Sequence, residues 1–144
     1  MIKIFIASAN LILLSAFAFC ETVPKNAYDG VENKVKKFYG ELFLMPSQTE
    51  ALDILTAKLK EKQKSLKSKI ALSKTQKTSA IYKKDFAKAK EETLKISSYE
   101  TEIETARIEY MKSLTIILND EEYDRLNEML INAASEKQKT KKNR

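Results

Sequence analysis

Glycine and proline are absent from Ser47 to the C-terminal Arg144, and this absence constrains the fold more than any other feature of the chain. The two glycines and two prolines all lie earlier, the last of them at Pro46. An all-β fold needs such residues in its turns, and nucleotide-binding enzymes need glycine-rich phosphate loops. The sequence therefore predicts an all-α protein with four helices joined by short polar turns.

The N-terminal segment has the pattern of an export signal. Lys3 is the only charged residue before Glu21, and the apolar run after it ends in Ala16-Phe17-Ala18, a cleavage site of the A-x-A type. We therefore predict that residues 1–20 are a signal peptide that is removed on export. The alternative is an uncleaved membrane anchor, for which the apolar run is barely long enough.

Cys20 is the only cysteine, and it stands where a bacterial lipoprotein would carry its lipid. Lipidation of Cys20 is therefore a further alternative, which the bulky Phe19 beside it disfavours. Without lipidation, Cys20 is lost with the signal or stays as a free thiol near the N-terminus. Since no second cysteine exists, no intrachain disulfide forms, and the domain depends on its apolar core.

Four amphipathic stretches predict the helices of one domain over residues 29–135. The expected helix ranges, with Asp29 as N-cap of the first, are 29–43, 47–72, 80–118 and 119–137. A polar cluster at 73–79 is predicted to form the turn between the second and third helices, which would then make a long antiparallel hairpin. Residues 21–28 are predicted to be a flexible leader. The basic residues 136–144 are predicted to be a disordered tail.

Apolar residues at steps of three and four predict which faces are buried. The stripe of the second helix is interrupted at Lys62 and comprises Leu52, Leu55, Leu59, Leu66 and Ile70. The stripe of the third helix comprises Phe86, Ala89, Thr93, Ile96, Ile103, Ala106, Tyr110, Leu114 and Ile117. We also expect Ser47 and Glu50 to form a capping box at the start of the second helix.

The composition argues against an enzyme. The chain has no histidine, so it lacks the side chain most often used for acid–base chemistry near neutral pH and for zinc. Its acidic residues are predicted to lie on solvent-facing sides of helices, and its single cysteine lies at the signal boundary. We therefore predict no catalytic residues, no metal site and no cofactor.

Lysines are concentrated in the second predicted helix. Residues 47–78 carry eight lysines and three acidic residues, whereas residues 119–135 are predominantly acidic. Export makes nucleic acid an improbable partner, which leaves an ordinary solvated surface or a binding face for proteins. On a binding face, long-range attraction would speed encounter and apolar contacts would hold the partner. The candidate client-binding residues are Lys58, Leu59, Lys62, Leu66, Lys69 and Ile70.

Two nonapeptides resemble each other, "LMPSQTEAL" at 44–52 and "LNDEEYDRL" at 118–126. Each combines a leading apolar residue, a helix start, a polar residue in the first turn and a later leucine. Asn119 is a good N-cap, and Glu122 is placed to complete a capping box with it. The motif residues, to which we assign a structural role, are Leu44, Pro46, Gln48 and Leu52 in the first copy, and Leu118, Asn119, Glu122 and Leu126 in the second.

This layout resembles the Spy/CpxP family of periplasmic stress proteins, whose hallmark is a twice-occurring LTxxQ motif. The first copy keeps Leu44 and Gln48 but has Met45 in place of the threonine; the second keeps Leu118 but has Asn119 and Glu122. The resemblance covers most of residues 29–131. It implies a cradle-shaped, all-helical homodimer, in which the two motif copies build and orient the helices.

The resemblance also implies two functions. The first is an ATP-independent periplasmic chaperone, a holdase that binds unfolded or aggregation-prone envelope proteins. The second is an envelope-stress adaptor or structural protein that binds one specific partner, such as a sensor kinase domain. Some relatives bind metals through histidine, a role that this chain cannot share because it has none. Membrane association is expected only through a lipid on Cys20, if that residue is lipidated.

Overall fold

The computed structural model describes residues 23, 24 and 26–142. These residues contain no strand, and the prediction of an all-α fold with four helices is confirmed. The helices are α1 (Val31–Leu42), α2 (Pro46–Tyr82), α3 (Phe86–Ile117) and α4 (Asp120–Lys142). Within this part of the chain, no helix combines the length and hydropathy that a bilayer span requires. The predicted signal peptide and Cys20 lie outside the described residues.

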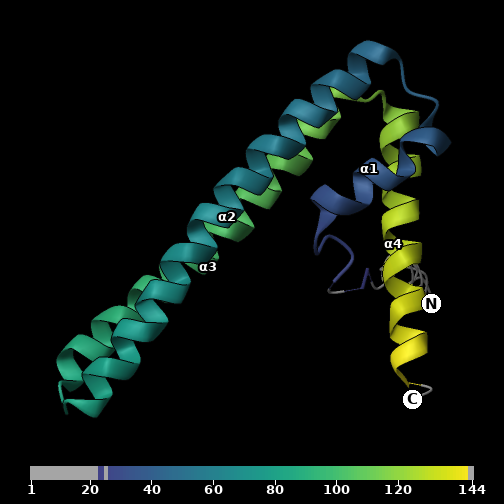
Figure 1. The fold of residues 1–144 in the computed structure, drawn as a ribbon. Coiled ribbons are helices and arrows are strands. Elements are labelled where there is room, and N and C mark those ends of the chain that lie inside the picture. The colour runs from purple at the N-terminus through teal and green to yellow at the C-terminus, as the bar shows by residue number, and fades with distance from the viewer. Residues whose placement is uncertain (1–22, 25, 143–144) are drawn as a thin grey trace, which may run out of the picture.

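Helices α2 and α3 lie side by side along their length, and a short turn joins them at one end of the molecule (Figure 1). Helix α4 starts at the opposite end and runs away from the pair at an angle. Helix α1 lies between α4 and the pair (Figure 1). We call residues 46–62 and 104–117 the near half of the pair, because α1 and α4 meet it there. Residues 63–82 and 86–103 are the far half.

Buried positions in the α2–α3 pair alternate in steps of three and four. This repeat of 3.5 residues is typical of coiled-coil packing. In α2 the buried residues are Leu52, Thr56, Leu59, Gln63, Leu66, Ile70, Ser73 and Ala80. In α3 they are Ala89, Glu92, Ile96, Ile103, Ala106, Tyr110 and Leu114.

The 3.5-residue repeat corrects two of the predicted stripes. Gln63 occupies the core position that we had placed at Lys62, and Lys62 is exposed. Glu92 occupies the position predicted for Thr93, which is exposed. The predicted stripes were chosen from apolar residues. The helices instead pack with a regular repeat of 3.5 residues, and polar residues occupy some of the buried positions of that repeat.

The apolar core has two separate parts. The larger cluster draws on all four helices and lies at the near half, with Val35, Leu52, Leu114 and Leu126 among its fully buried members. The smaller cluster lies in the far half and consists of Leu66, Ile70, Ile96 and Ile103, with Tyr99 packed against it. Only α2 and α3 contribute to the smaller cluster, and α1 borders the far half only through the polar Glu32 and Asn33, which line a hollow beside Gln63.

The turn between α2 and α3 differs from the prediction. Residues 73–79 are helical, and the hydroxyls of Thr75 and Thr78 donate hydrogen bonds to the carbonyls four residues earlier. The chain turns instead at 83–85, where Lys84 adopts a left-handed conformation with φ 61°. Asp85 then caps α3, since its Oδ1 accepts from the Lys88 amide at 3.0 Å. A polar cluster without glycine or proline was therefore no turn, because nothing in it breaks a helix.

Both ends of the described chain are more ordered than predicted. The leader ends in a hydrogen-bonded turn at 26–30, in which Ala27 is fully buried and its carbonyl accepts from Lys34 Nζ at 2.7 Å. Gly30, with φ 62°, takes the N-cap position of α1 that we had expected for Asp29. At the other end α4 continues to Lys142, through most of the predicted disordered tail. Its lysines, glutamines and glutamates are good helix formers, and no residue there ends the helix.

Candidate functional site

The two motif copies meet in space at the junction of α2 and α4. Gln48 Nε2 donates to Glu122 Oε2 at 2.8 Å and to the Ile117 carbonyl at 3.1 Å. Gln48 Oε1 accepts from the Met45 amide at 2.8 Å, so the same side chain also caps α2. The expected box of Ser47 and Glu50 is therefore wrong: α2 begins at Pro46, one residue earlier than predicted.

The second copy forms the predicted capping box of α4. Glu122 N donates to Asn119 Oδ1 at 2.9 Å, and Asn119 N donates to Glu122 Oε2 at 3.0 Å. Glu122 Oε2 therefore accepts from both Asn119 and Gln48, and one carboxylate ties the two helix starts together. The motif leucines serve the core, since Leu52, Leu118 and Leu126 are buried and Leu44 packs against the same cluster. The motifs are thus a structural joint rather than an exposed site.

The structure divides the six predicted client-binding residues into two groups. Lys58, Lys62 and Lys69 are exposed on α2. The other three, Leu59, Leu66 and Ile70, are buried between α2 and α3. In the closed helix pair, these six residues therefore do not form the expected surface that exposes charged and apolar groups together. These three residues form the core of the closed helix pair, and their role in client binding stays a prediction.

Two shallow hollows nevertheless bring most of these residues together on one side of the pair. Lys58 and Lys62 line both hollows. Leu59 lines the first, where Glu109 and Tyr110 of α3 form the other wall. The second hollow contains Leu66 and Lys69, and Glu102 faces them from α3. Ile70 lines neither hollow.

The lysines of α2 form an excess of positive charge that the described residues leave uncompensated. None of the eight forms an ion pair with a carboxylate of the described part of the chain. Lys69 instead lies over the ring of Tyr99 on α3, with Nζ 5.6 Å from the ring centroid. Unpaired charges along one helix produce a field that attracts anionic groups, and salt weakens it.

Exposed aliphatic side chains on the α2–α3 pair were missed by the sequence analysis. Leu94 is 64% exposed and Ile108 is 67% exposed, and they lie two heptads apart on α3. Ile116 on α3, and Ile54 and Leu72 on α2, are also exposed. The sequence did contain a signal for their exposure, because they are apolar residues at positions that do not belong to the 3.5-residue repeat of buried positions.

An apolar groove lies where α3 meets α4 and the turn before α1. Ile108 and Met111 of α3, Tyr28 of that turn and Tyr123 of α4 line it. Arg107 crosses one side, where its Nη1 contacts Glu104 at 2.6 Å and Asp29 at 3.4 Å. This groove therefore combines residues of α3, of α4 and of the turn before α1.

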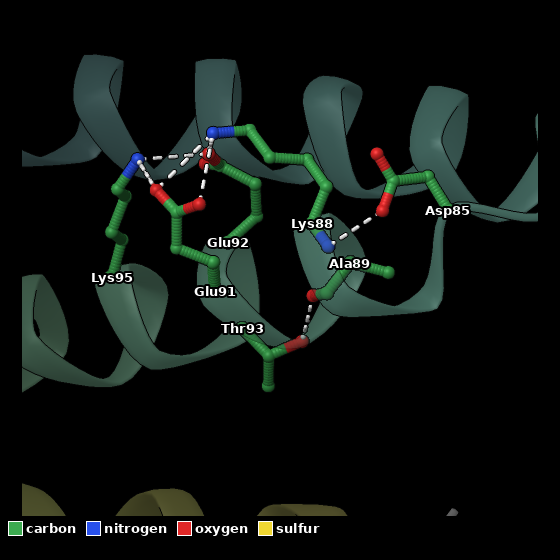
Figure 2. Close-up of polar contacts among 7 residues, drawn as sticks. All are labelled: Asp85, Lys88, Ala89, Glu91, Glu92, Thr93 and Lys95. Atoms are coloured by element: carbon green, nitrogen blue, oxygen red, sulfur yellow. Dashed lines mark hydrogen bonds and ion pairs between the residues drawn. The ribbon is translucent and has the colours of Figure 1, made fainter.

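The far half contains a charged residue in its core. Glu92 is fully buried, and its Oε1 lies 2.9 Å from Lys95 Nζ and 3.2 Å from Lys88 Nζ. Figure 2 shows the two ammonium groups beside the carboxylates of Glu91 and Glu92. Hydrogen bonding from Lys95 outweighs desolvation and lowers the pKa of Glu92 to about 2. The pKa of Lys95 is raised by the same pairs, with Glu91 as the largest cause.

Two polar groups in the far half have no hydrogen-bond partner among the described residues. They are Gln63 Nε2 and Glu92 Oε2. Ser73 of α2 faces Glu92 and contributes to its lowered pKa, but no hydrogen bond of ordinary length joins the two side chains. In the core of the near half, the buried hydroxyls of Thr56 and Tyr110 are paired at 2.9 Å, whereas Arg107 Nε at the edge of that half lacks a partner among the described residues.

The described residues contain no group of three or more His, Cys, Asp or Glu side chains placed to hold a metal ion. Comparisons with protein-family models, with curated proteins and with solved structures each found no match for the chain. The resemblance to the Spy/CpxP family therefore rests on the motif residues alone and stays a prediction.

Proposed function

We propose that this protein is an exported, ATP-independent holdase chaperone of the periplasm, which binds unfolded or aggregation-prone proteins along its α2–α3 pair. One observation carries the proposal: α2 presents eight lysines that form no ion pair with the described residues, and the same helix pair exposes large aliphatic side chains such as Leu72, Leu94 and Ile108. Such a surface attracts unfolded acidic chains over a distance and then holds them by apolar contact. No nucleotide or metal is needed for this activity.

The arrangement of the chain in this proposal is an antiparallel helical hairpin with a cradle-like shape that works as a homodimer. A dimer would cover part of the exposed apolar surface, which is extensive for a monomer of this size. Export follows from the predicted signal at residues 1–20, and a lipid on Cys20 would hold the protein at the envelope. Sedimentation at micromolar concentration tests the dimer, and a stable monomer would contradict it.

An aggregation assay tests the holdase function. A chemically denatured model protein is diluted into buffer of low salt with stoichiometric wild-type protein, and light scattering is followed. The proposal predicts suppressed scattering and weaker suppression in high salt, because screening reduces the attraction of the lysines. Unchanged scattering at low salt would refute it.

Matched variants test whether the lysines of α2 matter specifically. Replacing Lys58, Lys62 and Lys69 with glutamine should weaken suppression several-fold. The control replaces three exposed lysines elsewhere, Lys83, Lys90 and Lys112, with glutamine. Both variants lose the same net charge, so equal effects would show that only net charge matters and that α2 is not the binding surface.

A specific adaptor is the second candidate, and the groove at Tyr28, Ile108, Met111 and Tyr123 favours it. A single apolar groove with an adjacent Arg107 suits one defined partner better than many unfolded chains. Crosslinking followed by pull-down from an envelope extract separates the two functions. A holdase captures many proteins, whereas an adaptor captures one, and Tyr123→Ala should abolish only the capture by an adaptor, because Tyr123 belongs to α4 and not to the α2–α3 pair.

A further inference from the structure

The far half of the α2–α3 pair has a weak core. Its apolar cluster has only four buried members, Leu66, Ile70, Ile96 and Ile103, and all of them come from two helices. Gln63 separates this cluster from the near half, and its Nε2 has no partner among the described residues. A buried polar group left without a hydrogen bond destabilises the packing around it.

Beyond this cluster the core becomes weaker still. Ser73 and the charged Glu92 occupy the next core positions, and the small Ala80 and Ala89 follow toward the turn. Alanine and serine bury little apolar area, so these positions add little stability. The far half is therefore an apolar segment enclosed by polar or small residues on both sides, and neither α1 nor α4 contributes a member to its apolar cluster.

From these observations we infer that the far half opens as a unit while the near half stays folded. Opening uncovers a second binding surface, formed by Leu66, Ile70, Ile96 and Ile103, for apolar segments with acidic flanks. The inference rests on the proposed holdase function and identifies the kind of segment that the protein holds. Local opening of a weakly packed unit, with the rest of the fold intact, is common in proteins.

Charge explains why acidic flanks are expected. Lys62 and Lys69 lie beside Leu66 on α2, exposed and without ion pairs among the described residues. When α3 moves away, Glu102 on the other wall of the same hollow moves with it. The opened face of α2 then carries Leu66 and Ile70 bordered mainly by lysines, with Glu61 as the acidic residue of α2 in that hollow, and this excess of positive charge favours an apolar segment whose flanking residues are acidic.

Three variants test this inference. The closing variant, Gln63→Leu, replaces a buried amide that lacks a partner among the described residues with an apolar side chain, which should stabilise the closed pair. The control, Gln76→Leu, makes the same chemical change at an exposed position of the far half. The opening variant, Ser73→Asp, places a second carboxylate opposite Glu92 and leaves every apolar side chain in place.

Two quantities are measured for each variant. The first is amide hydrogen exchange in the far half. The second is the dissociation constant for a short labelled peptide of leucines flanked by glutamates, compared with a matched peptide flanked by lysines. If the peptide binds only the open form, its apparent affinity is proportional to the open population. Exchange rate and affinity must then change by the same factor.

We expect the closing variant to slow far-half exchange and to weaken peptide binding by the same factor, up to about fivefold, and the opening variant to raise both. The control should match the wild type, and the lysine-flanked peptide should bind more weakly throughout. Slower exchange with unchanged affinity would overturn the inference, because the peptide would then bind the closed surface. Far-half amides as protected as near-half amides in the wild type would also overturn it.

The aggregation assay keeps this result separate from the proposed function. If the wild-type protein suppresses aggregation but the peptide affinity of the variants does not change together with their exchange rates, only the proposed opening of the far half is contradicted. A wild-type protein that fails to suppress aggregation contradicts the holdase function, whatever the exchange rates are.

Discussion

The near and far halves of the α2–α3 pair have the same coiled-coil repeat but different surroundings. In the near half, α1 and α4 pack on the pair, and residues such as Leu52, Leu114 and Leu126 share one core. In the far half, Leu66, Ile70, Ile96 and Ile103 are buried by each other and by Tyr99. The same periodicity therefore gives a well-supported segment and a marginal one, because stability depends on how many elements contribute to the core.

Polar core residues sharpen the contrast. In the near half, Thr56 and Tyr110 hydrogen-bond to each other across the pair. In the far half, Gln63 and Glu92 each retain a buried polar atom without a partner among the described residues. A satisfied polar layer fixes the alignment of two helices, whereas an unsatisfied one lowers the cost of separating them.

The largest expected effect is on the shared core. Leu114→Ala should lower the free energy of unfolding by about 2–5 kcal/mol, because Leu114 is fully buried among residues of several helices. Urea denaturation followed by circular dichroism measures this.

Ile96→Ala, in the far half, should speed exchange there and leave near-half exchange almost unchanged. If Ile96→Ala destabilised both halves equally, the two halves would unfold as one unit.

The joint between the motif copies gives the next effect. Gln48→Ala removes hydrogen bonds to Met45, Ile117 and Glu122, and should cost about 1–3 kcal/mol in the free energy of unfolding. Gln76→Ala, at an exposed position of the same helix, serves as the control. A double-mutant cycle with Glu122→Ala should show coupling between Gln48 and Glu122. Additive losses would mean that the 2.8 Å contact contributes nothing.

Two substitutions of single polar core residues should have opposite signs. Tyr110→Phe leaves the buried Thr56 hydroxyl unpaired and should cost about 1 kcal/mol. Gln63→Leu removes an unpaired amide and should raise the free energy of unfolding by up to about 1 kcal/mol. Thermal unfolding of both variants measures the difference. The same sign for both would show that the two polar layers do not differ in energy.

A pH titration should produce the smallest effect. Because the folded-state pKa of Glu92 is lowered from 4.5 to about 2, its charged form stabilises the folded state above pH 4.5. That contribution should decline as the pH falls from about 4.5 to about 2, as Glu92 becomes protonated first in the unfolded chain. The stability of the far half, measured by hydrogen exchange, should therefore decrease less over this pH interval in Glu92→Gln than in the wild type. An identical loss in the two proteins would show that Glu92 plays no part.

The sequence predicted the helices better than their packing. The absence of glycine and proline after Pro46 led directly to the all-α fold, and the capping box of Asn119 and Glu122 located the start of α4. The turn was misplaced because Lys84 takes a left-handed conformation without glycine, and only Asp85 signalled the new helix. Hydroxyl-rich sequence was a weaker sign of a turn than the cap.

The candidate site was predictable only in its charged part. Lysines on a helix remain in solvent wherever the helix packs, so Lys58, Lys62 and Lys69 are exposed as expected. Whether Leu59, Leu66 and Ile70 are exposed depends on what lies against them, and a single helix does not reveal its neighbour. The contact between Gln48 and Glu122 likewise depends on how α2 and α4 meet.

Hydrogen exchange of the wild-type protein, with and without a bound unfolded client, tests the central claim most directly. The account predicts that the client slows exchange at apolar contacts of the open far half. It also predicts that the client raises exchange at the backbone near Ser73 and Glu92, where the pair is held apart. Near-half amides around Leu52 and Leu114 should be unchanged. A client that alters no far-half amide, or that protects the near half instead, would contradict the account.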